Sequence, residues 1–267
     1  MLFTYPNGCI GFGKSLDRKM KISLITACKN NESTIAGTIE SVIKQNYPDL
    51  EYIVVDGQST DRTLDIINHY KKHIHIVVSE PDNGIYDALN KGIKLATGEI
   101  IGFLHADDMF AYPDFLHDVA KQFKPGRCDA VYADLVYVDK NNPRKIIRRW
   151  RSGEYKEGDF LWGWMPPHPT FYAKKEIYDK YGMFDLRLRS AADYELMLRF
   201  IHKHKIQLCY IPKIAVLMRT GGKSNRSFLN RILANKEDRL AWKLNHLKPF
   251  FFTLWLKPIR KLPQYFQ

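Results

Sequence analysis

Short apolar runs alternate with helical patterns along the first half of the chain. Runs of strand length span residues 22–27, 52–55, 74–78 and 100–104. Between them, apolar residues recur three and four positions apart, which is the spacing of one helix face. Apolar strands separated by helices are typical of a parallel sheet that is covered on both sides. The pattern predicts an α/β fold, with a Rossmann-like, mostly parallel sheet and helices on both faces.

The second half of the chain is less regular. Residues 130–138 and 144–150 predict two strands joined by a turn, residues 191–204 predict a helix, and residues 208–211 predict a short strand. Residues 153–168 are rich in Gly, Pro and Trp, which favours a loop over a site.

Three parts follow from these patterns. Residues 1–19 have no periodicity, and we interpret them as an N-terminal extension, with Met20 as a candidate for the natural start. Residues 20–224 form the predicted main domain. Residues 225–267 are a predicted helical appendage rich in basic and aromatic residues, with apolar positions at helical spacing over residues 226–247.

Composition narrows the class of protein. Of the 267 residues, 45% are hydrophobic and 26% are charged, which is ordinary for a globular protein and excludes wholesale disorder. Cys9, Cys28, Cys128 and Cys209 lie far apart without a CxxC pair, which argues against a disulfide scaffold or a zinc site and favours a reducing cytosol. The longest apolar run, 249–256, is less than half of the roughly 20 residues that span a bilayer.

The charge balance indicates an anionic partner. The chain holds 41 Lys and Arg against 29 Asp and Glu, a formal net charge of +12. Nucleic acid, a phosphorylated small molecule and an acidic membrane surface are the candidates. No DNA-binding or RNA-binding motif accompanies the charge, so we expect no nucleic-acid partner.

Polar residues follow each predicted strand of the first half. Asp56 ends the second run, Asp82 follows the third, and Asp107 and Asp108 follow the fourth. The carboxyl ends of parallel strands share one edge of a sheet, where ligands bind. The adjacent Asp107 and Asp108 carboxylates repel one another, and a hard divalent cation such as Mg²⁺ or Mn²⁺ would relieve that repulsion. The alternative is an exposed Asp-Asp pair that caps the next helix.

As a set, these motifs resemble those of family 2 glycosyltransferases with the GT-A fold. The resemblance rests on ISLITA at 22–27, IVVDGQSTD at 53–61, GIYDALNKG at 84–92, ATGEI at 96–100 and ADD at 106–108, and it spans residues 20 to about 224. Among bacterial members, the chain is most similar to transferases that assemble capsule, O-antigen or exopolysaccharide repeat units. The resemblance implies a nucleoside-diphosphate sugar donor, expected to be a UDP-sugar.

The resemblance also implies a role for each residue of the donor site. Asp107 corresponds to the carboxylate on the ribose side and Asp108 to the ligand of Mn²⁺ or Mg²⁺. The residues expected to bind the nucleotide are, besides Asp107, Thr26, Asp56, Asp82, Asn90 and Lys91.

Transfer with inversion needs a general base on the acceptor hydroxyl. Asp193, in SAADYE at 190–195, matches the family's acidic segment, with Glu195 as the second candidate. Asp193 stands at the start of a predicted helix, whose dipole favours the charged carboxylate. The alternative is that Asp193 only caps this helix.

Further residues are candidates for contacts with the acceptor or with phosphate. Trp164 and Trp162 could stack on a sugar ring, and His168 could contact phosphate or sugar; a core role is the alternative for each. Lys223 and Arg226 correspond to a loop that closes near the diphosphate.

The C-terminal appendage concentrates the charge. From residue 223 to 267 there are ten Lys and Arg and two acids, Glu237 and Asp238, so this stretch carries +8 of the +12. Interleaved basic and aromatic residues are typical of a helix lying in a membrane interface, which would suit a lipid-linked acceptor. A tail packed on the domain, or an oligomer contact, is the alternative.

The sequence therefore predicts a metal-dependent, inverting glycosyltransferase acting on a growing, lipid-linked glycan. We expect it in the cytoplasm, peripheral at the inner face of the cell membrane, with contact to anionic lipid through the appendage. Two other classes remain open at this point: a nucleotidyltransferase built on a similar sheet, and a non-catalytic binder of membrane or nucleic acid.

Overall fold

The computed structural model describes residues 20–124, 126–221 and 228–265. The predicted extension 1–19 lies outside these residues. The helices and strands, in chain order, are β1 (Ile22–Cys28), α1 (Ile35–Ile43), β2 (Leu50–Asp56), α2 (Thr63–His69), β3 (Ile76–Ser79), α3 (Ile85–Leu95), β4 (Ile100–Phe103), β5 (Asp108–Phe110), α4 (Phe115–Gln122), β6 (Ala130–Val138), β7 (Ile146–Trp150), β8 (Tyr172–Lys174), α5 (Lys175–Tyr181), α6 (Ala192–Met197), β9 (Leu208–Arg219), α7 (Phe228–Leu244) and α8 (Thr253–Ile259).

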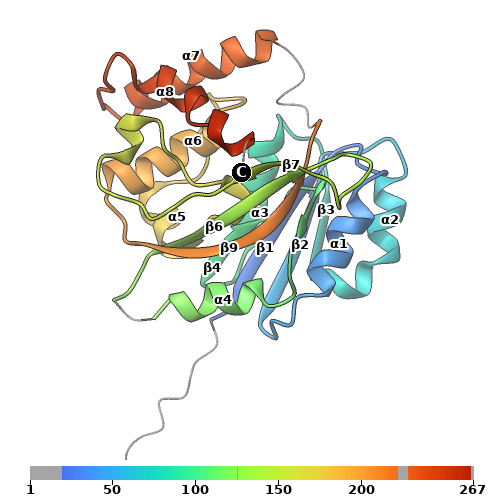
Figure 1. Cartoon of the computed structure of the whole chain (residues 1–267). Helices are drawn as coiled ribbons and strands as arrows, with labels where there is room; N and C mark the ends of the chain where they lie inside the picture. Colours follow the sequence, from blue (N-terminus) through green and yellow to red (C-terminus); the bar gives the residue numbers. More distant parts are fainter. Residues whose placement is uncertain (1–19, 125, 222–227, 266–267) are drawn as a thin grey trace, which may run out of the picture.

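One sheet organises the chain (Figure 1). Its strand order is β3-β2-β1-β4-β8-β6-β9-β5, with β7 paired to β6. The first four neighbours are parallel, so the carboxyl ends of β1, β2, β3 and β4 meet at one edge. The second half is mixed, since β8 is antiparallel to β4 and β6, whereas β6 and β9 are parallel. The predicted α/β class is confirmed.

Side-chain alternation along the strands creates two cores. Ile22 and Leu24 of β1 face α1, α2 and α4, whereas Ile25 and Ala27 face α3, α5 and α6. All four residues are at most 5% exposed. Helices therefore cover both faces of the sheet, as the near-continuous apolar strands predict.

Several elements differ from the sequence expectation. The strand expected at 208–211 continues to Arg219, because Pro212 and Lys213 bulge out of the ladder between the pairs Ile211↔Ala133 and Ile214↔Asp134. Strands β5 and β8 span only three residues each, too few for a period to be recognised.

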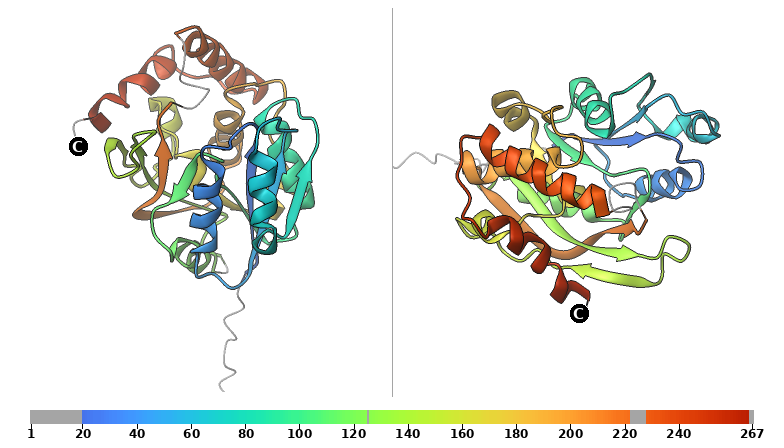
Figure 2. Two further views of the ribbon diagram at one scale, coloured as in Figure 1. Left: turned by 90° about the vertical axis from the view of Figure 1, so that its right-hand side faces the viewer. Right: turned by 90° about the horizontal axis from the view of Figure 1, so that it is seen from above.

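The C-terminal helices α7 and α8 lie together at one end of the molecule, above α6, with α4 at the opposite end (Figures 1 and 2). Ala241 and Trp242 of α7 and Leu254 of α8 are buried in the same core cluster as the sheet residue Ile25. The helical appendage thus packs on the domain. Within the described residues, no helix has both the length and the apolar character needed to cross a bilayer.

Candidate functional site

The carboxyl edge of the sheet begins with the turn after β2. Asp56 is paired with Cys28 on one side and Ser79 on the other. Its carboxylate is fully buried and accepts hydrogen bonds from the Ser59 backbone N–H at 3.0 Å, from the Ser59 hydroxyl and from the Ser79 hydroxyl at 2.7 Å. Because these donors use both oxygens, the structure gives Asp56 the role of holding the 56–59 turn.

Gly57 leaves space for the carboxylate of Asp82 at this edge. A Cβ on Gly57 would lie 1.9 Å from Asp82 Oδ2 and 3.3 Å from Lys29 Cδ. Asp82 Oδ1 accepts a hydrogen bond of 2.9 Å from the Gly84 N–H, which fixes the carboxylate at the start of α3. Asp82 is half-buried, so one side of it stays open to a ligand.

Three other expected nucleotide contacts lie in structural positions. Thr26 is fully buried and accepts a hydrogen bond of 3.1 Å from the Tyr52 hydroxyl. The Asn90 amide is buried and exchanges two hydrogen bonds with the backbone of Phe184, at 2.9 and 3.0 Å. Lys91 pairs with Glu80 at 2.9 Å and ties α3 to the loop before it. Of the three, Lys91 is the one at the rim of the site.

Asp107 and Asp108 point to different environments. Asp108 is fully buried, and neither of its carboxylate oxygens has a hydrogen-bond partner among the described residues. Burial and the neighbouring Asp107 charge raise the pKa of Asp108 well above its usual range. Asp107 is half-buried, and the Arg219 guanidinium holds its backbone carbonyl at 3.0 Å. Asp107 is therefore the carboxylate of the pair that a ligand reaches from solvent.

Asp193 comes from the far half of the chain to the same place. It stands in the first turn of α6 and is half-buried. The Tyr86 hydroxyl of α3 donates a hydrogen bond of 3.0 Å to Asp193 Oδ1. Desolvation and the Asp193 charge raise the pKa of Tyr86 well above its usual range, so the phenol keeps its proton and remains a donor.

His105 follows β4, and its ring lies 5.5 Å from the His168 ring. Burial lowers the pKa of His105, while the charges of Asp107 and Asp193 act in the opposite direction. The His168 ring contacts Phe184, and Phe184 contacts Tyr86, whose hydroxyl holds Asp193. These ring contacts connect the segment after β4 to the first turn of α6, 86 positions further along the chain than Asp107.

The helix α7 supports the segment that carries Asp193. The Glu237 carboxylate accepts hydrogen bonds from the backbone N–H groups of Arg189, Ser190 and Ala191, at 3.1, 2.7 and 3.0 Å. One turn further along, the Trp242 indole N–H donates to the Tyr194 hydroxyl at 2.9 Å. These contacts flank Asp193 on both sides in sequence.

The second candidate base, Glu195, has a structural role. It is 3% exposed, forms an ion pair with Arg199 at 2.9 Å, and accepts a hydrogen bond of 2.9 Å from the Asn245 amide. Its carboxylate is thus fixed inside the packing between α6 and α7.

The two tryptophans of the 153–168 loop have opposite surroundings. Trp164 is 5% exposed, packs against Phe160 and donates a hydrogen bond of 2.8 Å to the Ser152 carbonyl, which makes it a core residue. Trp162 is 53% exposed. A position in the core thus accounts for Trp164, and Trp162 is the one available for contacts outside the chain.

His168 lies beneath the site. Its ring stacks on Phe103 at a centroid distance of 5.2 Å and lies 5.5 Å from the His105 ring. Burial and His105 lower the pKa of His168 well below its usual range, and its Nε2 has no hydrogen-bond partner among the described residues. The other two expected phosphate contacts, Lys223 and Arg226, lie outside the described residues.

The donors present fit a cation that is shared with a substrate. Among the described residues, no group of three or more His, Cys, Asp or Glu side chains could hold a metal ion by itself. However, the two partnerless oxygens of Asp108 and the accessible carboxylate of Asp107 are adjacent hard ligands. Mg²⁺ is commonly bound by one or two carboxylates with substrate phosphates completing its shell.

Sequence reasoning missed Tyr86, Arg219 and Glu237. For Glu237 a signal exists, because Glu237 and Asp238 are the two acids in a strongly basic stretch. Asp238 is likewise used, in an ion pair of 2.7 Å with Lys257 of α8.

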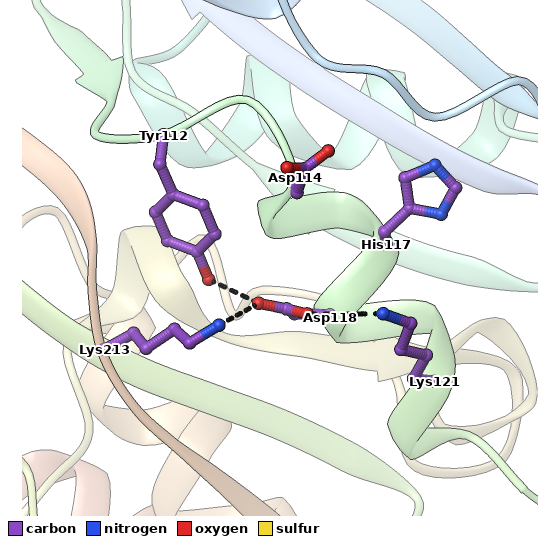
Figure 3. Close-up of a pocket in the computed structure, with 6 residues that line it drawn as sticks. All are labelled: Tyr112, Asp114, His117, Asp118, Lys121 and Lys213. Atoms are coloured by element: carbon purple, nitrogen blue, oxygen red, sulfur yellow. Dashed lines mark hydrogen bonds and ion pairs between the residues drawn. The ribbon is translucent and has the colours of Figure 1, made fainter.

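A separate polar pocket lies beside α4 (Figure 3). Asp118 is its centre and receives Tyr112 at 3.0 Å, Lys213 at 2.8 Å and Lys121 at 3.8 Å. The backbone N–H of Asn46, just beyond α1, donates to the Pro113 carbonyl just before α4, so this pocket lies at the amino edge of β1 and β2, opposite the site. Its charges are mutually satisfied, and it has no evident part in the site's chemistry.

A parallel sheet with carboxylates at its carboxyl edge, joined by an acidic helix start from the second half, is the arrangement of the GT-A fold. Residues 23–193 match the sequence model of the family described as Glycosyl transferase family 2. The chain belongs to this family, as its motifs suggest.

Curated relatives carry glycosyltransferase names. The chain is 30% identical over 221 residues to the "PGL/p-HBAD biosynthesis glycosyltransferase" of Mycobacterium bovis (strain BCG / Pasteur 1173P2), covering 79% of this chain and 83% of the relative. It is 40% identical over 93 residues to the "Putative teichuronic acid biosynthesis glycosyltransferase TuaG" of Bacillus subtilis (strain 168), covering 34% of this chain and 37% of that protein.

Solved structures share the fold. S. aureus TarS 1-349 in complex with UDP-GlcNAc has a TM-score of 0.66 and 20% identity over 85% of this chain; the chain spans 65% of that structure. Mannosyltransferase PcManGT from Pyrobaculum calidifontis, in complex with GDP-Man and Mn²⁺, has a TM-score of 0.64 and 19% identity over 90% of this chain and 72% of its own.

Proposed function

We propose that this chain is an inverting glycosyltransferase that moves a sugar from a nucleoside-diphosphate sugar, a UDP-sugar first of all, to a hydroxyl of a growing, lipid-linked glycan. The observation that carries the proposal is a pair of half-buried carboxylates on different elements: Asp107 after β4, whose backbone Arg219 holds, and Asp193 in the first turn of α6, whose side chain Tyr86 holds. One carboxylate lies where a donor diphosphate and its cation belong, and the other lies on a different element, available to an acceptor.

Asp193 is the proposed general base. Its Oδ1 is held by the Tyr86 hydroxyl, which orients the carboxylate and leaves Oδ2 for an acceptor hydroxyl. As the acceptor oxygen attacks the anomeric carbon from the face opposite the diphosphate, its proton passes to Asp193. The bond between the anomeric carbon and the diphosphate oxygen breaks, the nucleoside diphosphate leaves, and the configuration at that carbon inverts.

Asp107 and Asp108 are the proposed holders of a divalent cation, Mn²⁺ or Mg²⁺. Because both Asp108 oxygens are buried and Asp107 is accessible, we assign the outer contact to Asp107 and the support behind it to Asp108. When bound, the cation stabilises the charge that develops on the departing diphosphate. Arg219 fixes the backbone of Asp107 and adds positive charge at the same place.

The donor nucleoside is proposed to lie at the edge formed by Gly57 and Asp82. Gly57 keeps the backbone after β2 free of a side chain, and Asp82 offers a carboxylate oxygen to the hydroxyl or N–H groups of a nucleoside. The TarS structure contains UDP-GlcNAc and the PcManGT structure contains GDP-Man, so both uridine and guanosine donors are compatible with this fold. We place UDP first and GDP second.

The remaining elements concern the acceptor and its place in the cell. The curated relatives are named for the biosynthesis of PGL/p-HBAD and of teichuronic acid, which supports a glycan or glycolipid acceptor. The basic and aromatic C-terminal segment supports an acceptor presented by lipid, with the enzyme peripheral at the inner face of the cell membrane.

Calorimetric titration with UDP, with and without Mn²⁺, tests the donor site. We expect binding that depends on Mn²⁺ and is lost in Asp107→Asn, with Asp179→Asn, an exposed carboxylate of α5, as the matched control. Binding of GDP or dTDP in place of UDP would indicate a different donor nucleotide and would leave the proposed glycosyltransferase activity unchanged. A preference for nucleoside triphosphate with release of pyrophosphate would favour the nucleotidyltransferase. A protein that binds none of these nucleotides contradicts the proposal and favours a non-catalytic binder.

A further inference from the structure

Helix α8 and the residues on either side of it expose a row of large apolar side chains, the apolar stripe. Phe251 lies just before the helix, Trp255 and Ile259 lie four positions apart on one of its faces, and Leu262 begins the short 3-10 helix that follows. Their exposed fractions are 90%, 64%, 53% and 58%. Large side chains of a packed helix normally face the core, so an exposed stripe of this kind marks an interaction surface.

The inner side of α8 packs closely on the domain, so the apolar stripe faces solvent. Thr253 and Leu254 are buried, and the Thr253 hydroxyl donates a hydrogen bond of 2.7 Å to the Leu161 carbonyl. A Cβ on Gly163 would come within 2.6 Å of the Lys257 backbone nitrogen, which shows how closely α8 lies on the 159–163 turn. The helix therefore has no room to roll its apolar face inward.

A second segment extends the stripe into a patch. Trp162, from the 159–162 turn, is 53% exposed, and Phe250 is 46% exposed. Their rings lie 6.3 Å apart, and Phe252 lies 5.4 Å from the Trp162 ring. We call the six exposed residues the aromatic patch: Trp162, Phe250, Phe251, Trp255, Ile259 and Leu262.

The charge around the patch has one sign. The stretch from residue 248 to 267 contains Lys248, Lys257, Arg260 and Lys261 and no Asp or Glu. Lys257 is paired with Asp238 on the inner side, and Arg260 is exposed beside the patch. Burial and the nearby charges of Lys257 and Arg148 lower the pKa of Lys261 to about 8, so its ammonium faces the protein. Trp and Phe with flanking cations are the composition of surfaces that lie at the headgroup level of an anionic bilayer.

We infer that the aromatic patch inserts into the interface of an anionic membrane, with Arg260 on lipid phosphate. The inner side of the same helix contacts the residue that follows the proposed base in sequence: the Lys257 ammonium lies 3.6 Å from the centroid of the Tyr194 ring. A lipid-linked acceptor would thus be presented beside Asp193. This last step rests on the proposed function, and the patch deepens that proposal by naming the surface through which the enzyme would lie at the membrane.

Vesicle co-sedimentation tests the inference with the full chain. Wild type should bind vesicles of phosphatidylcholine and phosphatidylglycerol and bind pure phosphatidylcholine at least tenfold more weakly. The variant Phe251→Ser/Trp255→Ser should lose at least tenfold in binding, and Arg260→Glu should weaken the preference for anionic lipid. Leu186→Ser, a 50% exposed residue outside the patch, is the matched control and should bind as wild type.

Three results would overturn the inference. The wild type could fail to bind anionic vesicles, or the serine variant could bind them as well as the wild type does. The third result is a concentration-dependent dimer that the serine variant abolishes, with no binding of the wild type to vesicles. The last would make the patch a contact between copies of this chain. UDP titration of the serine variant separates the two proposals. If the variant binds UDP normally but no longer binds vesicles, the patch serves membrane binding and the donor site is independent of it. If the protein binds vesicles but no nucleotide, the membrane proposal is supported and the glycosyltransferase proposal is contradicted.

Discussion

Oxygen Oε2 of Glu237 accepts two hydrogen bonds from Ser190, from its backbone N–H at 2.7 Å and from its hydroxyl at 2.9 Å. Glu237 belongs to α7, and Ser190 lies three residues before Asp193. The same carboxylate also accepts hydrogen bonds from the N–H groups of Arg189, which precedes α6, and of Ala191, its N-cap residue. Glu237 is thus a positioning residue for the proposed base, and α7 is part of the site's scaffold.

Replacing Glu237 tests this role. Glu237→Ala should lower the transfer rate about tenfold with little change in affinity for the donor, because the Asp193 segment loses its anchor while the donor edge is untouched. Loss of a capping carboxylate also costs about 1–2 kcal/mol of stability. Glu237→Gln keeps one acceptor oxygen and should recover part of the rate. Glu176→Ala, at an exposed acid of α5, is the control; an equal loss of donor affinity and rate in Glu237→Ala would argue for general unfolding instead.

Gly57→Ala tests the nucleoside edge. The new methyl would collide with the Asp82 carboxylate, the mobile end of a side chain, so Asp82 should move while the fold persists. We expect affinity for UDP to fall about tenfold, with a thermal midpoint close to that of wild type. Unchanged UDP affinity would remove Asp82 and Gly57 from the proposed donor site.

Asp107→Asn and Asp108→Asn separate the two adjacent carboxylates. Asp107→Asn should abolish the effect of Mn²⁺ on UDP binding, because it removes the accessible ligand. Asp108→Asn should weaken that effect but raise stability slightly, since a buried carboxyl without a partner is costly in the wild type. Calorimetry with and without Mn²⁺ and urea unfolding distinguish the outcomes. The reverse pattern, with only Asp108→Asn losing the Mn²⁺ effect, would restore Asp108 as the outer ligand.

Glu51 gives the protein a defined sensitivity to acid. Burial alone would raise the pKa of this carboxyl, but hydrogen bonds from Lys21, Ser23 and Thr97 outweigh it and lower the pKa to about 2, from an ordinary 4.5. A lowered pKa stabilises the fold above pH 4.5, and the stabilisation is lost as the pH falls from 4.5 toward 2. A shift of this size corresponds to about 3 kcal/mol.

Glu51→Gln removes this titration. In urea unfolding between pH 6 and 3, the wild type should lose stability more steeply than Glu51→Gln, and the variant should be less stable than wild type at pH 7. Glu176→Gln, an exposed acid, should follow the wild-type slope. Parallel slopes for wild type and Glu51→Gln would contradict the assigned pKa.

The sequence predicts the carboxyl edge of the sheet because each strand is defined by a short apolar run and the polar residues directly after it. Apolar runs of four to six residues define parallel strands, and the polar residues that follow them share one edge of the sheet, so Asp82 and Asp107 are expected at the same edge. The motif order adds Asp193 through resemblance, and the structure places it against Tyr86 of α3, the helix that follows Asp82.

Other features depend on packing that no local pattern reports. Alternation implies that Asp107 and Asp108 face opposite ways, but which one faces inward is decided by β9, which pairs with β5 and carries Arg219. Trp162 and Trp164 stand two positions apart in an irregular loop. Trp162 contacts Phe252, just before α8, and stays exposed, whereas Trp164 contacts Phe160 in the core and is buried. Glu237, which binds Ser190, lies 47 positions away on α7, and the apolar spacing of that helix does not predict what its acidic residues contact.

The central claim is that Asp193 takes the acceptor proton at a functioning donor site. The most direct measurement compares wild type with Asp193→Asn in two assays on the same preparations: UDP binding with Mn²⁺ by calorimetry, and UDP release from a UDP-sugar in the presence of membranes that carry the acceptor. We predict unchanged UDP affinity and a release rate that is lower by at least about 100-fold, as expected for removal of a general base. Asp179→Asn should behave as wild type. A variant that still transfers at the wild-type rate, or one that loses UDP binding as well, would contradict the role assigned to Asp193.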